Sequence, residues 1–185
     1  LAVVFDMDGT LTDSEEEWDV VRRGLAAEDG VAWPEDATKA MMGMSTPEWS
    51  AHLVETVGLR GTPDEAAERT ISGMADAYRA GRIPKLPGAA DAVRRMAEIA
   101  PLAVASSSPR TLIEEGLGLL GVRELVGVIV STEEVARGKP HPDGFLAACA
   151  QLGVDPATTV AVEDSTNGVA SALAAGMKVV VVPPR

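Results

Sequence analysis

Five short runs of the chain are apolar on successive residues rather than on alternate ones. Such runs are typical of strands in a parallel sheet, because helices cover both faces of that kind of sheet. We therefore expect five strands, each of them buried on both faces. They span residues 2–6, 102–106, 126–130, 159–163 and 178–182.

Helical patterns follow the second, third and fourth of these runs. Residues 109–120, 142–152 and 165–175 carry apolar side chains at the spacing of a helix stripe. The last of the three ends at Gly176, which is a natural helix stop. This alternation of strand and helix predicts an α/β fold with a doubly wound parallel sheet.

Residues 14–83 follow a different pattern, with four helical segments and no β-branched run. Thr62 and Glu65 form the capping-box signature of a helix start. We predict an all-helical domain over 14–83, inserted between the first and second strands, and an α/β core from residues 1–13 and 84–185. The four segments end at Gly30, Gly43, Gly58 and Gly81.

Composition narrows the classes of partner. The chain has 185 residues and a net charge of −12, which would repel the phosphates of nucleic acids and anionic membranes. A small phosphorylated metabolite remains compatible with that charge, because a few local cations and backbone amides can bind it. The one cysteine, Cys149, cannot form an internal disulfide, which predicts a reducing, cytoplasmic location. No apolar run approaches the ~20 residues of a membrane span.

Carboxylates gather where two predicted strands end. The first strand runs into residues 6–10 (DMDGT), and the fourth ends in Glu163 and Asp164. If these strands flank the point where the strand order reverses, up to four acidic side chains converge there. Two carboxylates ~4 Å apart repel by roughly 4 kcal/mol at an effective dielectric constant of ~20, so the cluster needs a cation or raised pKa values. The simpler alternative is that Asp6 and Asp8 only cap a turn.

Oxygen ligands without a nearby His or Cys favour Mg²⁺ as that cation. An anion site is predicted close by, because Ser106, Ser107 and Ser108 lead from the second strand into a helix start. A plain N-cap would explain one of these serines. Lys139 lies in a Gly-Lys-Pro turn that favours an inward-pointing ammonium over a solvated one.

These four pieces, in this order, resemble the four sequence motifs of the haloacid dehalogenase superfamily, and the helical insert matches that family's small cap. The resemblance extends over essentially the whole chain. It implies that Asp6 is a nucleophile that forms an aspartyl-phosphate. Asp8 would protonate the leaving oxygen and then activate water.

The resemblance also implies the binding groups. Asp6, the backbone carbonyl of Asp8 and Asp164 would hold Mg²⁺, with Glu163 in support. The phosphoryl oxygens would be bound by Ser106, the amide of Ser107 and Lys139. The expected function is Mg²⁺-dependent hydrolysis of a small phosphomonoester, such as a sugar phosphate or a phosphoglycolate-like metabolite, by a monomer or a small homo-oligomer.

Other functions compete with the phosphatase. Haloacid dehalogenases lack the second aspartate, so Asp8 argues against them. The phosphonoacetaldehyde-cleaving branch of the superfamily ranks low because it also replaces the second aspartate. A β-phosphoglucomutase-like enzyme is the closest competitor, but it carries a His and an Arg where this chain has Trp18 and Thr46. In those mutases the Arg grips a second phosphate of the substrate from the cap. A cation for that purpose could still come from Arg22, Arg23 or Lys39. A catalytically silent interaction module is a further alternative, and the complete set of motif residues argues against it.

The helical insert supplies the candidates for substrate specificity. The alternative for its two tryptophans is that they simply form the core of the cap. The candidates are Trp18, Met44, Ser45, Thr46 and Trp49.

Overall fold

The computed structural model describes residues 1–41 and 44–183, and the chain divides into two compact units. The core unit consists of Leu1–Ser14 and Ile83–Arg185, and the cap unit of Glu15–Arg82. The catalytic and specificity roles assigned to these two parts of the chain stay predictions.

The core unit is built on one parallel five-stranded sheet in the order β3-β2-β1-β4-β5. Strand β1 therefore has β2 on one side and β4 on the other, so the strand order reverses between β1 and β4. The predicted switch point is confirmed. The strands are β1 Ala2–Phe5, β2 Leu102–Ser106, β3 Val128–Ser131, β4 Thr159–Glu163 and β5 Lys178–Val181.

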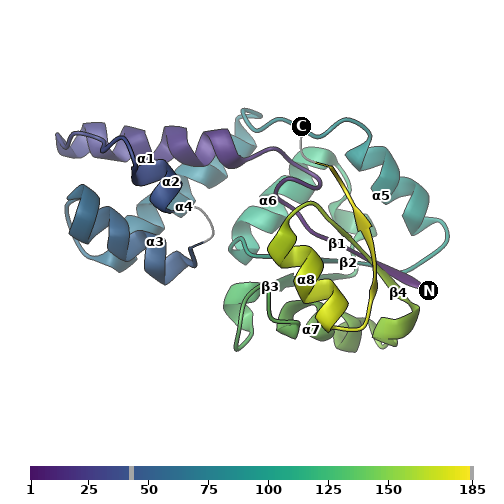
Figure 1. Cartoon of the computed structure of the whole chain (residues 1–185). Coiled ribbons are helices and arrows are strands. Elements are labelled where there is room, and N and C mark those ends of the chain that lie inside the picture. Colours follow the sequence, from purple (N-terminus) through teal and green to yellow (C-terminus); the bar gives the residue numbers. More distant parts are fainter. Residues whose placement is uncertain (42–43, 184–185) are drawn as a thin grey trace. The chain divides into compact units, whose positions relative to one another are not determined.

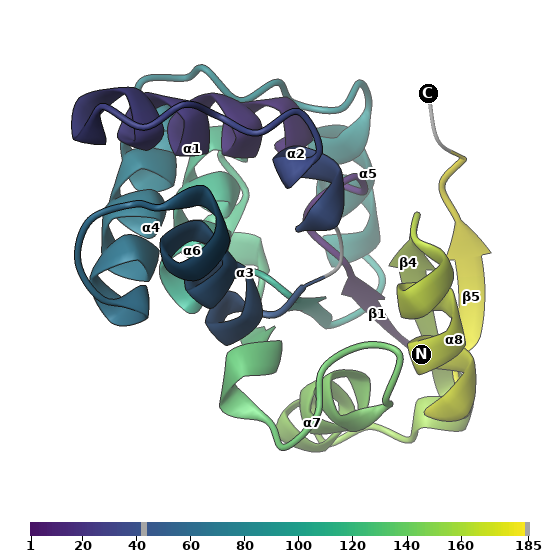
Figure 2. The same cartoon turned by 60° about the vertical axis from the view of Figure 1, so that its left-hand side comes forward.

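Side chains that alternate along the strands divide the core into two layers. Val3 and Phe5 pack with one pair of helices, whereas Val4 packs with the other pair. Helices therefore cover both faces of the sheet (Figures 1 and 2), and the predicted doubly wound α/β fold is confirmed. The first pair is α5 Ala89–Ala97 and α6 Arg110–Leu120, and the second is α7 Asp143–Leu152 and α8 Thr166–Ala174. Helix α5 is absent from the predicted elements.

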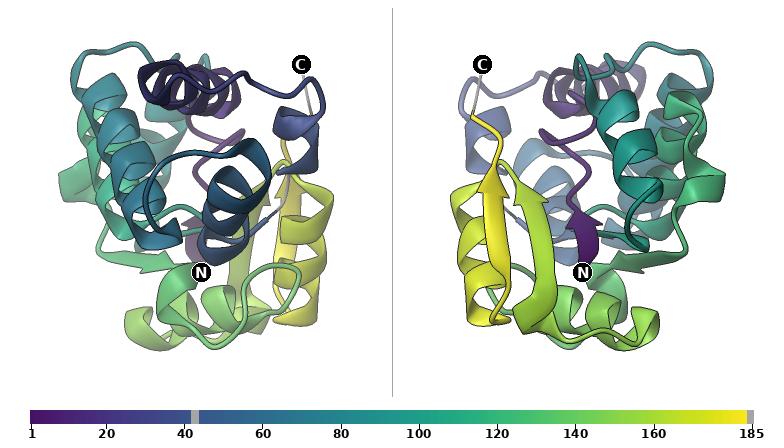
Figure 3. Two further views of the ribbon diagram at one scale, coloured as in Figure 1. Left: turned by 90° about the vertical axis from the view of Figure 1, so that its left-hand side faces the viewer. Right: turned by 90° about the vertical axis from the view of Figure 1, so that its right-hand side faces the viewer.

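Strand β5 departs from the expected burial. The prediction that all five strands are buried on both faces is wrong here, because Val180 and Val181 are 54% and 55% exposed. The cause is position: β5 lies at the edge of the described sheet and pairs only with β4, as the right-hand view of Figure 3 shows. A continuous apolar run does not distinguish an edge strand from a central one.

The cap unit is all-helical over its described residues. Residues Leu53–Val57 continue α3 as one π-helical turn that stops at Gly58, whose φ is 93°. The capping box at Thr62 and Glu65 is confirmed, and the predicted stop at Gly43 lies outside the described residues. The helices are α1 Glu15–Asp29, α2 Ala37–Ala40, α3 Thr46–His52 and α4 Pro63–Arg79.

The cap has a hydrophobic core of its own, in which Leu25, Trp49, Leu53 and Ala66 are buried. Helices α1, α3 and α4 and the π-helical turn supply these side chains, and α1 and α3 each pack against α4 (Figure 2). Across both units, none of the described helices is long and apolar enough to cross a membrane.

Candidate active site

Three carboxylates meet at the carboxyl ends of β1 and β4. Asp6 directly follows β1, and its N–H continues the ladder by donating to the carbonyl of Val162 at 2.9 Å. Glu163 is the last residue of β4, and Asp164 follows it. One carboxylate oxygen from each of Asp6, Glu163 and Asp164 lies within 4.8 Å of the others. We call these three residues the acidic cluster; of the up to four acidic side chains expected to converge here, these three do so, and Asp8 is not part of the group.

Lys139 is the cation of this cluster. Its ammonium donates to Asp6 Oδ1 at 2.5 Å and to Glu163 Oε1 at 2.6 Å, and its side chain is only 8% exposed. The same nitrogen lies 5.3 Å from the centroid of the Phe145 ring in α7. The solvated alternative for this lysine is therefore wrong, and the inward-pointing one is confirmed.

Burial sets the proton affinity of the cluster. It raises the pKa of Asp6 to about 7; the charge of Lys139 opposes that rise, and Glu163 adds to it. Burial and the charge of Glu163 also raise the pKa of Asp164. Burial opposes the charge on Lys139, but Asp6 and Glu163 outweigh it and raise the lysine's pKa. One ammonium thus faces three carboxylates, and the all-oxygen donor set fits a hard divalent cation such as Mg²⁺.

Two glycines make room for these carboxylates. A Cβ at Gly168 would lie 1.6 Å from Glu163 Oε1, and a Cβ at Gly9 would lie 2.1 Å from Asp164 Oδ2. Gly9 also has a φ of 87°, which side-chain-bearing residues rarely adopt. Neither position can therefore accept a side chain unless a carboxylate moves.

Asp8 is held separately, by hydroxyl groups. Ser14 Oγ donates to Asp8 Oδ1 at 2.5 Å, while Ser108 Oγ and Ser106 Oγ donate to Asp8 Oδ2 at 2.7 and 3.3 Å. The carboxylate of Asp8 is thus fixed beside the predicted phosphate-binding serines. The metal contact predicted for its backbone carbonyl stays a prediction.

The predicted phosphate-binding residues come from two loops of the core unit. Ser106 is the last residue of β2 and is buried, Ser107 is exposed, and Lys139 contacts the acidic cluster. The amide of Ser108 donates to Ser106 Oγ at 3.0 Å, which fixes that hydroxyl at the start of the loop. Phosphate binding by these residues stays a prediction.

Several supporting residues escaped the sequence analysis. Ser14 directly precedes α1 and Ser108 is one of three consecutive serines, yet both donate hydrogen bonds to Asp8. Thr10 Oγ1 donates to Asp164 Oδ1 at 3.2 Å, and Ser165 supplies its N–H and its hydroxyl to Glu163 Oε2 at 2.8 and 3.0 Å. The signal available was their position within the loops that carry the acidic residues.

All five predicted specificity residues belong to the cap unit. The rings of Trp18 and Trp49 meet edge to face, with centroids 6.0 Å apart and an interplanar angle of 61°. Trp49 is buried, and both Trp18 and Met44 pack against the cap core. The N–H and hydroxyl of exposed Ser45 donate to Glu48, and Thr46 begins α3. Trp49 therefore belongs to the core of the cap, and Trp18 packs against that core. The specificity roles stay predictions.

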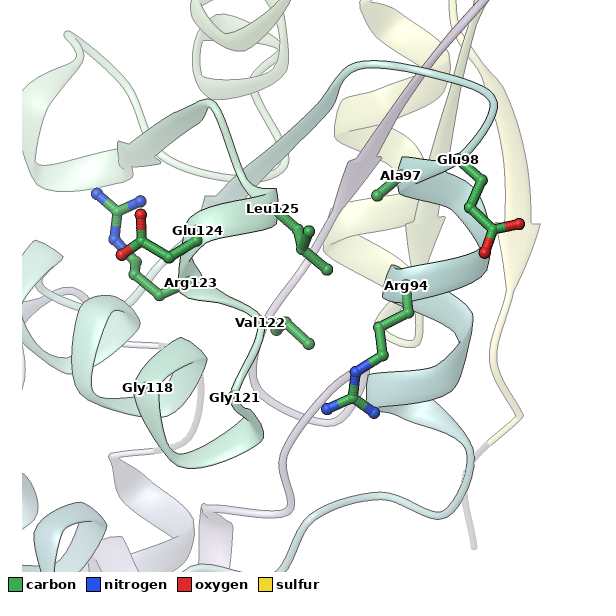
Figure 4. Close-up of a pocket in the computed structure, with 9 residues that line it drawn as sticks. All are labelled: Arg94, Ala97, Glu98, Gly118, Gly121, Val122, Arg123, Glu124 and Leu125. Atoms are coloured by element: carbon green, nitrogen blue, oxygen red, sulfur yellow. The ribbon is translucent and has the colours of Figure 1, made fainter.

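The core unit also has a pocket of about 710 Å³ that includes no residue of the acidic cluster (Figure 4). It lies between helix α5, which carries Arg94, and the segment that runs from the end of α6 through the 3-10 turn Arg123–Leu125. Its lining residues are Arg94, Ala97, Glu98, Gly118, Gly121, Val122, Arg123, Glu124 and Leu125.

Comparison with protein families agrees with this site. The model of the haloacid dehalogenase-like hydrolases matches residues 1–176. The chain belongs to the haloacid dehalogenase-like hydrolase family, and the predicted resemblance is confirmed.

Individual relatives narrow the enzyme class. The chain is 36% identical to hexitol phosphatase B of Escherichia coli (strain K12) over 189 aligned residues, which cover 99% of this chain and 83% of the relative. It is similar to the structure of CbbY from Rhodobacter sphaeroides in complex with phosphate, with a TM-score of 0.88, 27% identity and coverage of 100% and 86%. It is also similar to the structure of a putative β-phosphoglucomutase from Thermotoga maritima. The TM-score is 0.77 and the sequence identity is 29%, and the match covers 96% of this chain and 83% of that one. The family match and the relative named as a phosphatase support the phosphohydrolase class for this chain.

Proposed function

We propose that the chain is a Mg²⁺-dependent phosphatase that hydrolyses a small phosphomonoester of the sugar or polyol class through an aspartyl-phosphate on Asp6. One observation carries the proposal: Asp6 lies in the acidic cluster and contacts the buried ammonium of Lys139. A carboxylate nucleophile, a cation and an all-oxygen metal site then coincide at the carboxyl edge of a parallel sheet.

In the first displacement, a carboxylate oxygen of Asp6 bonds to phosphorus and the bond to the leaving oxygen breaks. Asp8 gives that oxygen its proton, so the alcohol leaves neutral. Negative charge builds on the equatorial phosphoryl oxygens, and Lys139 together with Ser106 and the amide of Ser107 would stabilise it.

In the second displacement, the carboxylate of Asp8 takes a proton from water, whose oxygen bonds to phosphorus. The bond between phosphorus and Asp6 breaks, and inorganic phosphate is released. Ser14 and Ser108 support this double role, because their hydroxyls hold both oxygens of Asp8 in one orientation.

Mg²⁺ would be held by Asp6, Asp164 and the backbone carbonyl of Asp8, with Glu163 in support, and it would neutralise phosphoryl charge. The oxygen atoms of Asp6, Glu163 and Asp164 within 4.8 Å support this assignment. The hard donor set favours Mg²⁺ over metals that prefer His or Cys.

The substrate class rests on the relatives and on the cap. Hexitol phosphatase B and a phosphorylated carbohydrates phosphatase of Thermotoga maritima, 29% identical over 178 residues, both act on phosphorylated carbohydrates or polyols by name. Substrate selection is assigned to cap residues. They are Trp18, Met44, Ser45, Thr46 and Trp49.

The single buried cysteine, Cys149, supports a reducing, cytoplasmic location.

The test is phosphate release from hexitol phosphates, hexose phosphates, phosphoglycolate and an aryl phosphate, with Mg²⁺ and with EDTA. We expect release with Mg²⁺ only, and a loss of at least about a thousandfold in kcat for Asp6→Asn. The matched control is Glu98→Gln, an exposed carboxylate of the core unit outside the acidic cluster. Acid quenching during turnover should trap the aspartyl-phosphate, so the peptide that contains Asp6 should carry one additional phosphoryl group. EDTA-resistant release, or an active Asp6→Asn enzyme, would overturn the proposal.

A phosphomutase is the second candidate, favoured by the similarity to the putative β-phosphoglucomutase. It is tested by conversion of glucose 1-phosphate to glucose 6-phosphate with catalytic glucose bisphosphate present. Isomer formation faster than phosphate release would assign the mutase function instead.

A further inference from the structure

Ser171 is a buried serine of helix α8 whose hydroxyl bonds outside its own helix. The residue is 0% exposed, and its Oγ donates to the backbone carbonyl of His141 at 2.6 Å. A serine inside a helix usually faces solvent or bonds back to the carbonyl four residues earlier. Here the partner lies 30 positions away in the sequence, so the hydroxyl joins two separate segments of the core unit.

The segment that Ser171 contacts is the irregular loop that carries Lys139. Residues 135–142 form neither helix nor strand and lead into α7. Inside this loop, the amide of His141 donates to the carbonyl of Gly138 at 3.0 Å and closes a turn around the lysine. The hydrogen bond from Ser171 accepts at the same residue, so it connects this turn directly to α8.

An ion pair also spans the loop, but it lies at the surface. Arg137 contacts Asp143, the first residue of α7, at 3.0 Å, and the arginine side chain is 58% exposed. Exposed pairs of this kind contribute little to stability because water screens the charges and both side chains lose freedom. The bond from the buried hydroxyl of Ser171 is therefore the stronger restraint on the loop backbone.

Lys139 depends on such a restraint because its side chain has a flexible four-carbon stem. Its ammonium nevertheless contacts two carboxylates, Asp6 at 2.5 Å and Glu163 at 2.6 Å. Helix α8 also holds the second of these, since its N-cap Ser165 donates from its N–H and Oγ to Glu163 Oε2 at 2.8 and 3.0 Å. Ser171 lies about 9 Å further along the same helix, at a rise of roughly 1.5 Å per residue. One helix thus contacts both Glu163 and the loop of the lysine that pairs with it.

We propose that Ser171 is a positioning residue, whose hydroxyl holds the loop of Lys139 so that the ammonium stays in contact with Asp6 and Glu163. The proposal rests on the proposed phosphatase function, in which that ammonium stabilises charge on the phosphoryl oxygens. Ser171 acts through the lysine, because its own hydroxyl contacts His141 and not the acidic cluster. Without the hydroxyl, the loop would open more often and carry the ammonium away from the two carboxylates.

The first measurement follows the position of Lys139 without turnover. The full-length chain is treated briefly with acetic anhydride, and mass spectrometry of its peptides gives the acylation rate at each lysine. Lys139 should react slowly in the wild type, since its side chain is 8% exposed and its ammonium is paired. The exposed lysines at positions 39, 85 and 178 are internal references. In Ser171→Ala we expect the rate at Lys139, relative to these references, to rise at least about tenfold.

The matched control is Ser50→Ala in the cap. Ser50 is 2% exposed, and its hydroxyl donates to the carbonyl of Pro47 at 3.3 Å, so the same substitution removes a buried hydroxyl whose partner is local. The acylation rate at Lys139 should stay within about twofold of the wild type in this control, because the two sites share no partner. A response to any buried serine-to-alanine change would appear in both variants.

The second measurement concerns catalysis. In Ser171→Ala we expect kcat for the best phosphate ester to fall about tenfold with KM within about threefold, because a displaced ammonium stabilises the transition state less. In a Lys139→Met background the same substitution should change the remaining activity by less than about twofold, because the group through which Ser171 acts is gone.

The outcomes distinguish a positioning residue from an ordinary buried serine. Faster acylation of Lys139 in Ser171→Ala but not in Ser50→Ala, together with a loss of kcat that disappears in the Lys139→Met background, supports the proposal. An unchanged acylation rate overturns it, and so does an unchanged kcat or an additive loss in the double variant. If the wild-type chain hydrolyses no phosphate ester, the phosphatase proposal fails, while the acylation rates still decide whether Ser171 holds Lys139 in place.

Discussion

Lys139 in the core unit and Arg22 in the cap unit are both largely buried cations that lie near aromatic rings, yet their surroundings differ in charge. Two carboxylates contact Lys139, at 2.5 and 2.6 Å. Arg22 contacts two indoles and no carboxylate among the described residues. The core satisfies its cation within the protein, and the proposed reacting groups would thereby be positioned before substrate binds. In the cap, the buried Nε of Arg22 has no hydrogen-bond partner among the described residues.

The difference also predicts opposite energetic roles. Removal of Lys139 would leave Asp6 and Glu163 buried without their cation, whereas removal of Arg22 would leave no anion behind. Four experiments can break or sharpen this comparison, and they are ordered from the largest expected effect to the smallest.

Lys139→Met should have the largest effect. We expect the free energy of unfolding without metal to fall by about 3–5 kcal/mol, because two buried carboxylates lose their cation. Divalent cations should restore part of that loss, while phosphatase activity stays low. Urea unfolding with and without Mg²⁺ measures both effects. Lys178→Met, at an exposed lysine of β5, should change stability by less than about 0.5 kcal/mol. A small effect of Lys139→Met would show that the acidic cluster does not depend on this ammonium.

Gly168→Ala should reverse the usual effect of alanine in a helix. Alanine is normally better than glycine by roughly 0.5–1 kcal/mol, but here its Cβ would lie 1.6 Å from Glu163 Oε1. We therefore expect a net loss of about 1–3 kcal/mol through overpacking, together with reduced metal binding. Gly118→Ala in α6 is the matched control, because a Cβ there meets nothing within 4 Å and should stabilise. Equal stability of the two variants in chemical unfolding would contradict the tight contact.

The ion pair of Arg69 with Asp29 provides a pH test within the cap. Hydrogen bonds from Arg69 hold the pKa of Asp29 below its usual value of 3.8. A carboxyl with a lowered folded-state pKa contributes stability above its unfolded pKa and loses that contribution as pH falls through the folded value. The stability gap between wild type and Asp29→Asn should therefore be present at about pH 6 and shrink by about pH 3. Asp36→Asn, at an exposed carboxylate of the cap whose side chain makes no cap hydrogen bond, is the matched control.

Arg22→Met should change stability least. The lost cation–π contacts, about 0.5–2 kcal/mol, are offset by relief of an unsatisfied buried N–H worth about 1–3 kcal/mol. We expect a thermal midpoint equal to or slightly above that of the wild type, measured without anions. A large drop would indicate that the arginine is a structural element of the cap and would remove the contrast with Lys139.

The sheet could be predicted well because its physical causes are local. Runs such as 102–106 and 159–163 are apolar on consecutive residues, and a parallel sheet covered by helices is the fold that buries them. Edge position is not local, so the exposure of Val180 and Val181 was missed. Helix α5 was missed within the stretch that returns from the cap to β2.

The acidic residues of the site could also be predicted, because carboxylates grouped at the ends of buried strands repel one another and need a cation or raised pKa values. The residues that hold these carboxylates or leave room for them could not be predicted. That Ser14 folds back onto Asp8, or that Gly168 leaves room for Glu163, depends on turns that bring distant backbone segments within contact distance. Residue type suggests a hydrogen-bond donor or a small side chain, but it does not identify the partner.

The sequence by itself determined the alternation of strand and helix, the helical insert and the types of chemical groups available at the strand ends. Those follow from local hydrophobic pattern and from the chemistry of side chains. Only the tertiary structure decided that Lys139 has two carboxylate partners while Arg22 has none among the residues that the structure describes. Both are cations in helical or loop segments of an acidic chain, and whether a charge meets a counter-charge depends on packing between segments far apart in sequence.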